Sequence, residues 1–191
     1  MTAIQFDGQQ TDERILFMIT PHRFAHYIAI TKLFFLCAVF YSILIFISYT
    51  VPVMQTTIRG GGFVLAVLTF LAGFWWNKRV YTLSKTYITD RRIIRFEIVS
   101  PFFQTKRALF WNEALKAKGF ASNIFYRGFG IGTVEVQPHL SEHESVKVSD
   151  VHLFEDIANY IDKIIYTFNN ERSEVANFKP FVPKPRGQRG A

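Results

Sequence analysis

Histidine is the residue type in this 191-residue chain with the clearest potential for chemistry, and four of its five histidines form pairs with a spacing of four. The pairs are His22 with His26 and His139 with His143. In a helix this spacing would place both imidazoles on one face, but neither pair has the HExxH pattern of a zinc protease. The second pair lies in the polar stretch HLSEHES, which favours a solvated loop over a weak surface metal site. The first pair flanks Arg23 and is expected at the level of lipid headgroups, so we predict no metal site.

Three glycines in the pattern Gly128-x-Gly130-x-Gly132 superficially suggest a phosphate-binding loop. Such a loop needs a strand before it and a helix N-terminus after it, whereas a strand-like segment follows this one. A turn or bulge with a positive φ is therefore the better prediction. The chain has no GxSxG motif and no recognisable pair of catalytic acids, and its one cysteine excludes disulfides, cysteine-based zinc sites and iron–sulfur clusters. We therefore expect no enzyme activity and no cofactor.

Positive charge is concentrated in one part of the chain. The formal net charge is +7, from 22 Lys and Arg against 15 Asp and Glu. Residues 78–118 contain ten Lys and Arg against three Asp and Glu, whereas residues 1–77 have a balance of +1 and residues 119–191 of −1. Basic residues beside an anionic leaflet attract it by about 1 kcal/mol each. The candidate lipid-headgroup contacts in this block are Lys78, Arg79, Lys85, Arg91, Arg92 and Arg95.

Two interpretations of this basic block stay equally open. It can reflect the retention of positive charge on the cytoplasmic side of a membrane, with solvated strand faces, or it can recognise anionic headgroups specifically. Within the block, Asp90 is expected to hold backbone amides of a turn while Arg91 and Arg92 point outward. The RGQRG segment near the C-terminus weakly suggests RNA binding, but membrane tethering disfavours it, so no nucleic-acid partner is expected.

Two uncharged stretches precede and adjoin the basic block. Residues 33–53 are 21 residues without a charge, and residues 62–76 form a second uncharged stretch. A bilayer core needs roughly 20 apolar residues in a helix, so we predict membrane spans at about residues 30–53 and 60–78. Buried core helices of a soluble protein are the disfavoured alternative, and a cleavable signal peptide is disfavoured further.

Aromatic and basic residues predict how these spans lie in a membrane. Trp75 and Trp76 directly precede a basic segment, which is typical of the membrane–water interface, so both are expected as interface anchors. Only Arg59 is charged in the connection between the spans, whereas basic residues cluster outside them. Positive residues stay cytoplasmic, so we predict a hairpin with both termini cytoplasmic and the lipid bilayer as a partner.

Small residues offer the two spans a way to pack, because close backbone approach holds helices together in lipid. Cys37 is expected to be an apolar filler within the first span. The small residues at spacings of four and seven are Ala38 and Ser42 on the first span, and Gly62, Ala66 and Gly73 on the second.

The period of the pattern changes after residue 80. Residues 92–99, 105–111, 133–137 and 145–149 alternate apolar and polar side chains and are rich in β-branched and aromatic residues, so they are predicted strands. Residues 14–20, RILFMIT, are either a further strand or an interfacial segment, and the strand is preferred.

A helical period follows these strands. Ser149 or Asp150 is expected to cap the helix, and Asn169 or Asn170 to end it. Strands followed by one amphipathic helix predict an α+β arrangement in which the helix covers one end or face of a curved sheet. Residues 171–191, which are basic and rich in Pro and Gly, are predicted to be disordered. The apolar stripe of the helix consists of Leu153, Ile157, Ile161, Ile164 and Phe168.

Three segments together resemble the bacterial pleckstrin-homology-like membrane proteins (bacterial PH-like domain, type 2). The segment Tyr87-Ile-Thr-Asp-Arg-Arg-Ile-Ile94 is similar to that family's opening strand and turn. Gly128-Phe-Gly-Ile-Gly-Thr-Val134 is similar to its glycine-rich turn, and Asp12-Glu-Arg-Ile-Leu16 with His22 to its lead-in before two spans. The order of the segments also matches, and the resemblance covers about residues 11–170.

The resemblance implies a PH-like antiparallel barrel or split sheet, closed by a C-terminal helix and held at the bacterial inner membrane. The expected organisation is a lead-in (1–27), a transmembrane hairpin (28–79), a cytoplasmic PH-like domain (80–170) and the tail. The resemblance implies no enzyme. The leading hypothesis is a protein-interaction or assembly module whose partner is another protein or a second copy, and the alternative is anionic-headgroup binding through the basic patch.

Overall fold

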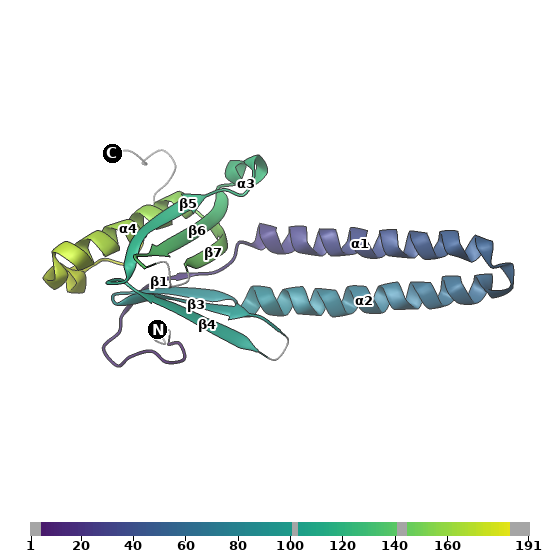
Figure 1. Ribbon diagram of the computed structural model, residues 1–191, viewed down its shortest axis with the longest axis horizontal. Helices are drawn as coiled ribbons and strands as arrows, with labels where there is room; N and C mark the ends of the chain where they lie inside the picture. The colour runs from purple at the N-terminus through teal and green to yellow at the C-terminus, as the bar shows by residue number, and fades with distance from the viewer. Residues whose placement is uncertain (1–4, 101–102, 141–144, 184–191) are drawn as a thin grey trace. The chain divides into compact units, whose positions relative to one another are not determined.

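The chain divides into two units that are interleaved in the sequence (Figure 1). A computed structural model describes residues 5–100, 103–140 and 145–183. The sheet unit consists of Met1–His22 together with Ser84–Ala191, and the hairpin unit is Arg23–Leu83. The hairpin is thus an insertion into the sequence of the sheet unit.

The hairpin unit consists of α1 (Arg23–Thr50), the short 3-10 helix η1 (Pro52–Met54) and α2 (Gln55–Leu83). Both long helices are long and apolar enough to cross a membrane. They contain 28 and 29 residues and extend beyond the predicted spans at the ends that join the sheet unit. At 1.5 Å per residue each is roughly 42 Å long, about the thickness of a bilayer with its headgroups.

Small residues line the contact between α1 and α2, in part as predicted. Gly62 and Ala66 are buried, and a Cβ on Gly62 would lie 2.8 Å from the Leu44 side chain. On α1 the prediction is wrong, because Ala38 and Ser42 are exposed. The buried α1 residues are Cys37, as expected of a filler, and Ser48. The contact face is therefore displaced by about one residue from the predicted one.

One sheet has four antiparallel strands in the order β1-β2-β3-β4. They are β1 (Ile15–Ile19), β2 (Lys85–Thr89), β3 (Arg92–Ile98) and β4 (Gln104–Phe110). The preferred strand at residues 14–20 is confirmed by the pairing of β1 with β2. The hairpin is inserted between these two paired strands.

The other sheet has three antiparallel strands in the order β5-β6-β7. They are β5 (Ala114–Phe120), β6 (Ile131–Pro138) and β7 (Val146–His152), and a short helix α3 (Ile124–Gly128) connects the first two. The described strands form two antiparallel sheets that do not close into a barrel, which confirms the predicted α+β class. The alternating pattern of the sequence predicted neither β2 nor β5.

Helix α4 (Phe154–Asn170) covers the three-stranded sheet, as the 3.6-residue period predicts (Figure 1). It contributes Ile157, Ile161 and Ile164 to a core that also contains Trp111 and residues from both sheets. The predicted N-cap is wrong. Leu153 occupies that position with a φ of 59° and makes no side-chain capping bond, so neither Ser149 nor Asp150 caps the helix.

Part of the predicted tail is folded against α4. A 3-10 helix η2 (Arg172–Asn177) follows α4, and Phe178 and Phe181 pack against the core. The Tyr160 hydroxyl donates to the Lys179 carbonyl over 2.8 Å, and burial raises the pKa of Tyr160 to about 12, against a smaller opposing effect of Arg14. The predicted tail thus begins with residues that have a described structure, 172–183, while residues 184–191, including RGQRG, lie outside the described residues.

Candidate functional site

The structure separates the two histidines of the first pair. His22 belongs to the sheet unit, where its backbone N–H donates to the Asp150 carbonyl (2.7 Å) and its ring lies 5.4 Å from that of His152. Burial and the neighbouring His152 lower the pKa of His22. His26 lies in α1 and stacks on Tyr81 of α2. The spacing of four therefore does not build a shared site.

The second pair is only partly described. His139 is exposed after β6, and His143 lies outside the described residues. Among residues 5–100, 103–140 and 145–183, no three His, Cys, Asp or Glu side chains are grouped as metal ligands would be.

The glycine pattern forms a turn before a strand, as predicted. Gly130 has a φ of 67°, which is in the region that favours glycine. Gly132 lies in β6, where a Cβ would come within 2.6 Å of the Phe154 ring and 2.7 Å of the Phe120 carbonyl. The first glycine of the pattern has open space around it. The glycines therefore serve the backbone turn and the packing of α4.

The predicted interface anchors lie on the last turns of α2. Trp75 is exposed and Trp76 is half-buried. The Arg79 guanidinium lies 5.5 Å from the centre of the Trp75 ring, and Lys78 is exposed beside it. A cation over an aromatic face is an attractive arrangement that suits an interface, where one side is apolar and the other polar.

The remaining candidate basic residues do not form one patch. Lys85 is the first residue of β2 and Arg91 follows its last, so they lie at opposite ends of a strand about 13 Å long at 3.3 Å per residue. Arg91 is exposed, and its Nη1 donates to Gln10 Oε1 over 2.6 Å.

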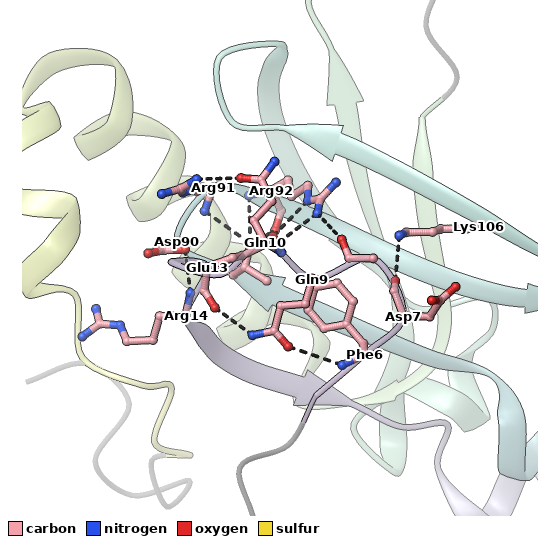
Figure 2. Close-up of polar contacts among 12 residues, drawn as sticks. Phe6, Asp7, Gln9, Gln10, Glu13, Arg14, Asp90, Arg91, Arg92 and Lys106 are labelled. Carbon is pink, nitrogen blue, oxygen red and sulfur yellow. Dashed lines mark hydrogen bonds and ion pairs between the residues drawn. The ribbon is translucent and has the colours of Figure 1, made fainter.

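Arg92 is buried, which corrects the expectation that it points outward. Its Nε donates to Glu13 Oε1 (2.9 Å) and its Nη2 to Glu13 Oε2 (2.8 Å), as Figure 2 shows. The Glu13 side chain is fully buried, and its Oε1 also accepts from the Thr89 hydroxyl over 2.8 Å. We call Glu13, Thr89 and Arg92 the clasp. Its geometry assigns Arg92 to the interior rather than to a lipid surface.

Opposing effects set the charge of the Glu13 carboxyl. Burial alone would raise its pKa, but hydrogen bonds from Arg92, from the Gln10 backbone N–H and from Thr89, together with the Arg92 charge, hold the pKa below its ordinary value. The carboxylate is thus ionised at neutral pH. Two opposite charges with their hydrogen bonds satisfied can remain buried without the penalty of an isolated charge.

The clasp fastens the N-terminal segment, residues 5–13, across the four-stranded sheet (Figure 2). Arg92 Nη2 donates to the Gly8 carbonyl, and Lys106 Nζ donates to the Asp7 carbonyl over 2.8 Å. Phe6 stacks on Tyr87 of β2 with ring centres 4.9 Å apart. The segment thereby covers an apolar patch on the sheet face that points away from the main core.

Asp90 behaves as predicted in binding a backbone amide. Its Oδ1 accepts from the Arg14 backbone N–H over 3.1 Å, and its own N–H donates to the Arg14 carbonyl. The amide belongs to the residue before β1 rather than to the β2–β3 turn itself. Asp90 thus ties the start of β1 to the end of β2.

Arg95 is largely taken up by neighbours within the sheet unit. Its Nη2 donates to Glu97 Oε1 over 3.2 Å, and its side chain is 20% exposed. Burial lowers the pKa of Arg95, as does Arg107, while Glu97 and Asp150 raise it. The charge of Arg95 is therefore balanced locally, by the Glu97 carboxylate.

Comparisons of the chain with protein-family models, curated proteins and solved structures find no match. The likeness to the bacterial PH-like family rests on the sequence segments described at the outset.

Proposed function

We propose that this chain is a non-enzymatic, membrane-anchored protein that presents a PH-like sheet unit as an interaction or assembly module. In this proposal the hairpin crosses the bacterial inner membrane and both chain ends are cytoplasmic. The module binds another protein or a second copy of the chain.

The exposed apolar surface of the hairpin unit carries the anchoring part of the proposal. Phe35 and Phe46 on α1 are 62% and 74% exposed, and Leu68 on α2 is 58% exposed. Side chains of this kind surround both helices over most of their length. A contiguous apolar surface of this size is unfavourable in water and matches the hydrocarbon of a bilayer.

The strand order supports the PH-like part. Four antiparallel strands, then three, then one C-terminal helix packed on the second sheet agree with the architecture that the sequence resemblance implies. Several polar groups of the sheet unit have structural tasks. Glu13 holds Arg92, Asp162 Oδ1 accepts from the Ala117 backbone N–H, and Glu135 pairs with Lys147.

The outer edge of β4 is the surface that best suits a protein partner. In the described part of the chain β4 pairs only with β3, so its other edge presents unpaired backbone groups. Most of its side chains are exposed. Such an edge can accept a strand from another chain, with backbone hydrogen bonds supplying affinity.

We expect the η1 turn and the sheet unit to lie on opposite sides of the membrane. Chains with Cys37 replaced by Ala would carry a single cysteine at Val53, which is 97% exposed in η1, or at Glu155, which is exposed on α4. In intact cells a membrane-impermeant maleimide should label Val53→Cys and should label Glu155→Cys only after lysis. Equal labelling of both positions in intact cells would contradict the anchoring.

We expect a partner to contact the edge of β4 in the membrane. A photo-crosslinking amino acid at Thr105, exposed on β4, should give a discrete protein adduct, whereas the same group at Glu155 should not. An adduct of twice the chain mass identifies a second copy. The absence of an adduct at Thr105, or identical adducts at both positions, would contradict the use of this edge.

Anionic-headgroup binding is the second candidate function. It is favoured by Lys78 and Arg79 at the end of α2 and by Lys85 at the start of β2, all within a few residues of the predicted interface. Six residues were predicted as lipid-headgroup contacts. Of these, Arg92 is buried and Arg91 lies beyond the far end of β2, so fewer than six support this function.

A further inference from the structure

We propose that two apolar tips at one end of the sheet unit insert into the surface of the lipid bilayer. This end, called the attachment end, is where β1 leads to α1 and β2 follows α2, and Ile19 pairs there with Thr86. The proposal rests on the membrane anchoring proposed above, since the bilayer is the binding partner.

The first tip consists of two described residues, Val99 after the end of β3 and Phe103 before the start of β4. Lys85, where β2 begins, pairs with Phe96, so β3 continues past the start of β2. The overhang from Phe96 to Ser100 is roughly 13 Å at 3.3 Å per residue. Val99 N–H donates to the Phe103 carbonyl over 3.1 Å, which closes the turn. Both side chains project into solvent, since Val99 is 65% and Phe103 72% exposed.

The second tip is α3, where Ile124 is 80% and Phe125 is 75% exposed. The position of α3 is fixed by a hydrogen bond at its N-terminus and by the partial burial of one of its side chains. Asn123 Oδ1 accepts from the Tyr126 backbone N–H over 2.8 Å, and Tyr126 itself is partly buried. Two large apolar side chains are thus presented on a fixed turn without any contact that would shield them from water.

Backbone contacts place α3 at the attachment end. Gly130, two residues after α3, accepts from the Leu153 N–H over 3.0 Å, and Asp150 at the same end accepts from the His22 N–H. His22 directly precedes Arg23, the first residue of α1.

Chain connectivity brings this end to the bilayer if the hairpin spans it. A single residue, Ser84, separates α2 from β2. The part of α2 beyond its uncharged stretch, Lys78 to Leu83, is about 8 Å long at 1.5 Å per residue. The attachment end therefore follows the uncharged part of α2 after only a short length of chain.

The composition of the tips also favours lipid. Phenylalanine and aliphatic side chains enter the boundary between headgroups and acyl chains, while flanking basic residues remain among the headgroups. Arg127 in α3 and Lys85, which pairs with Phe96 at the base of the overhang, supply those charges. Apolar insertion, rather than the basic patch predicted from sequence, then provides the main contact of the sheet unit with the membrane.

The test uses the full chain with Cys37 replaced by Ala and single cysteines that carry bimane. The reporter positions are Phe103 and Phe125. Leu140, which is 61% exposed at the opposite end of β6, is the matched apolar control, and Leu68 on α2 reports the hairpin itself. Each labelled chain is placed in nanodiscs of phosphatidylethanolamine and phosphatidylglycerol, with and without lipids that carry a doxyl quencher near the headgroup or in mid-chain.

The proposal expects headgroup-level doxyl to quench most of the bimane emission at Phe103 and Phe125 while Leu140 keeps its emission. Quenching at both tips no greater than at Leu140 overturns it. Quenching at Leu68 by mid-chain doxyl shows that the hairpin is anchored, so failure of the tips and failure of the anchoring are distinguishable.

Two further measurements test whether something other than apolar insertion into lipid explains contacts at the attachment end. In nanodiscs of neutral phosphatidylcholine the quenching at the tips should persist. If it disappears there, charge alone makes the contact and apolar insertion is wrong. If the emission at Phe125 instead shifts only when two chains share one nanodisc, the tips bind a second copy and the lipid proposal is overturned.

Discussion

Replacing Glu13 by Gln is expected to destabilise the sheet unit by about 3–5 kcal/mol, because it leaves the Arg92 guanidinium buried without an opposite charge. The side chains of Glu13 and Arg92 are 0% and 11% exposed, so solvent cannot substitute for the lost carboxylate. Urea unfolding of the full chain in nanodiscs, followed by the near-ultraviolet circular dichroism of the buried aromatic residues, measures the change. Amide hydrogen exchange should show the largest loss of protection in residues 5–13 and in β2 and β3.

Two matched variants separate loss of the clasp from general damage. Glu135→Gln removes an ion pair of 3.2 Å with Lys147, whose side chain is 56% exposed, and should cost less than about 1 kcal/mol. Adding Arg92→Met to Glu13→Gln removes the unpaired charge and should restore much of the stability. Equal losses for Glu13→Gln and Glu135→Gln would show that the clasp is not a buried ion pair.

The clasp also predicts an acid-sensitive N-terminal segment. The pKa of Glu13 is lowered on folding from its ordinary value of 4.5. A carboxyl with a lowered folded pKa stabilises the protein fully above the unfolded pKa, and this stabilisation is lost as the pH falls through the folded pKa. Protection of residues 5–13 should therefore decrease below about pH 4.5 in the native chain, while Glu13→Gln should lack this step.

The long helices were the most predictable part of the fold. The uncharged stretches and the 3.6-residue period of α4 extend over many residues, so each element is specified by its own sequence. The packing face of α1 was misplaced by one residue, because Ala38 and Cys37 are both small and only the partner helix selects between them. Periodicity thus predicts a helix more reliably than its contacts.

Two strands escaped prediction for physical reasons. β5 has the sequence ALKAKGF, in which Ala, Lys and Gly have low strand propensity, and it is held by its pairing with β6 and its burial under α4. β2 has only five residues and begins one residue after a long helix. In both strands tertiary pairing outweighs local preference.

The clasp and the apolar tips were still harder to predict from the sequence. Glu13 and Arg92 are separated by 79 positions, and no periodicity relates them. The five residues of α3 are too few to show a helical period, so the exposure of Ile124 and Phe125 was not predicted. The concentration of positive charge in residues 78–118 predicted Arg92 to be on the surface. Net charge does not distinguish an arginine that is paired in the interior from one that contacts lipid.

Trp111→Ala is expected to destabilise the sheet unit at least as much as Glu13→Gln does, by about 3–5 kcal/mol. Trp111 is fully buried between the two sheets, and its Nε1 donates to the Thr89 carbonyl over 2.9 Å. The substitution leaves a large cavity and an unsatisfied carbonyl next to the clasp. Trp111→Phe keeps most of the volume and should lose about 1–3 kcal/mol, chiefly from the unpaired carbonyl.

Phe125→Ala is the matched control for the loss of an aromatic side chain. Because Phe125 is 75% exposed in the same unit, its removal should change the free energy of unfolding by about 0.5 kcal/mol or less. The same urea titration in nanodiscs measures all three variants. Comparable losses for Trp111→Ala and Phe125→Ala would contradict the assignment of Trp111 to the core, whereas a silent Phe125→Ala agrees with a side chain whose contacts lie outside the fold.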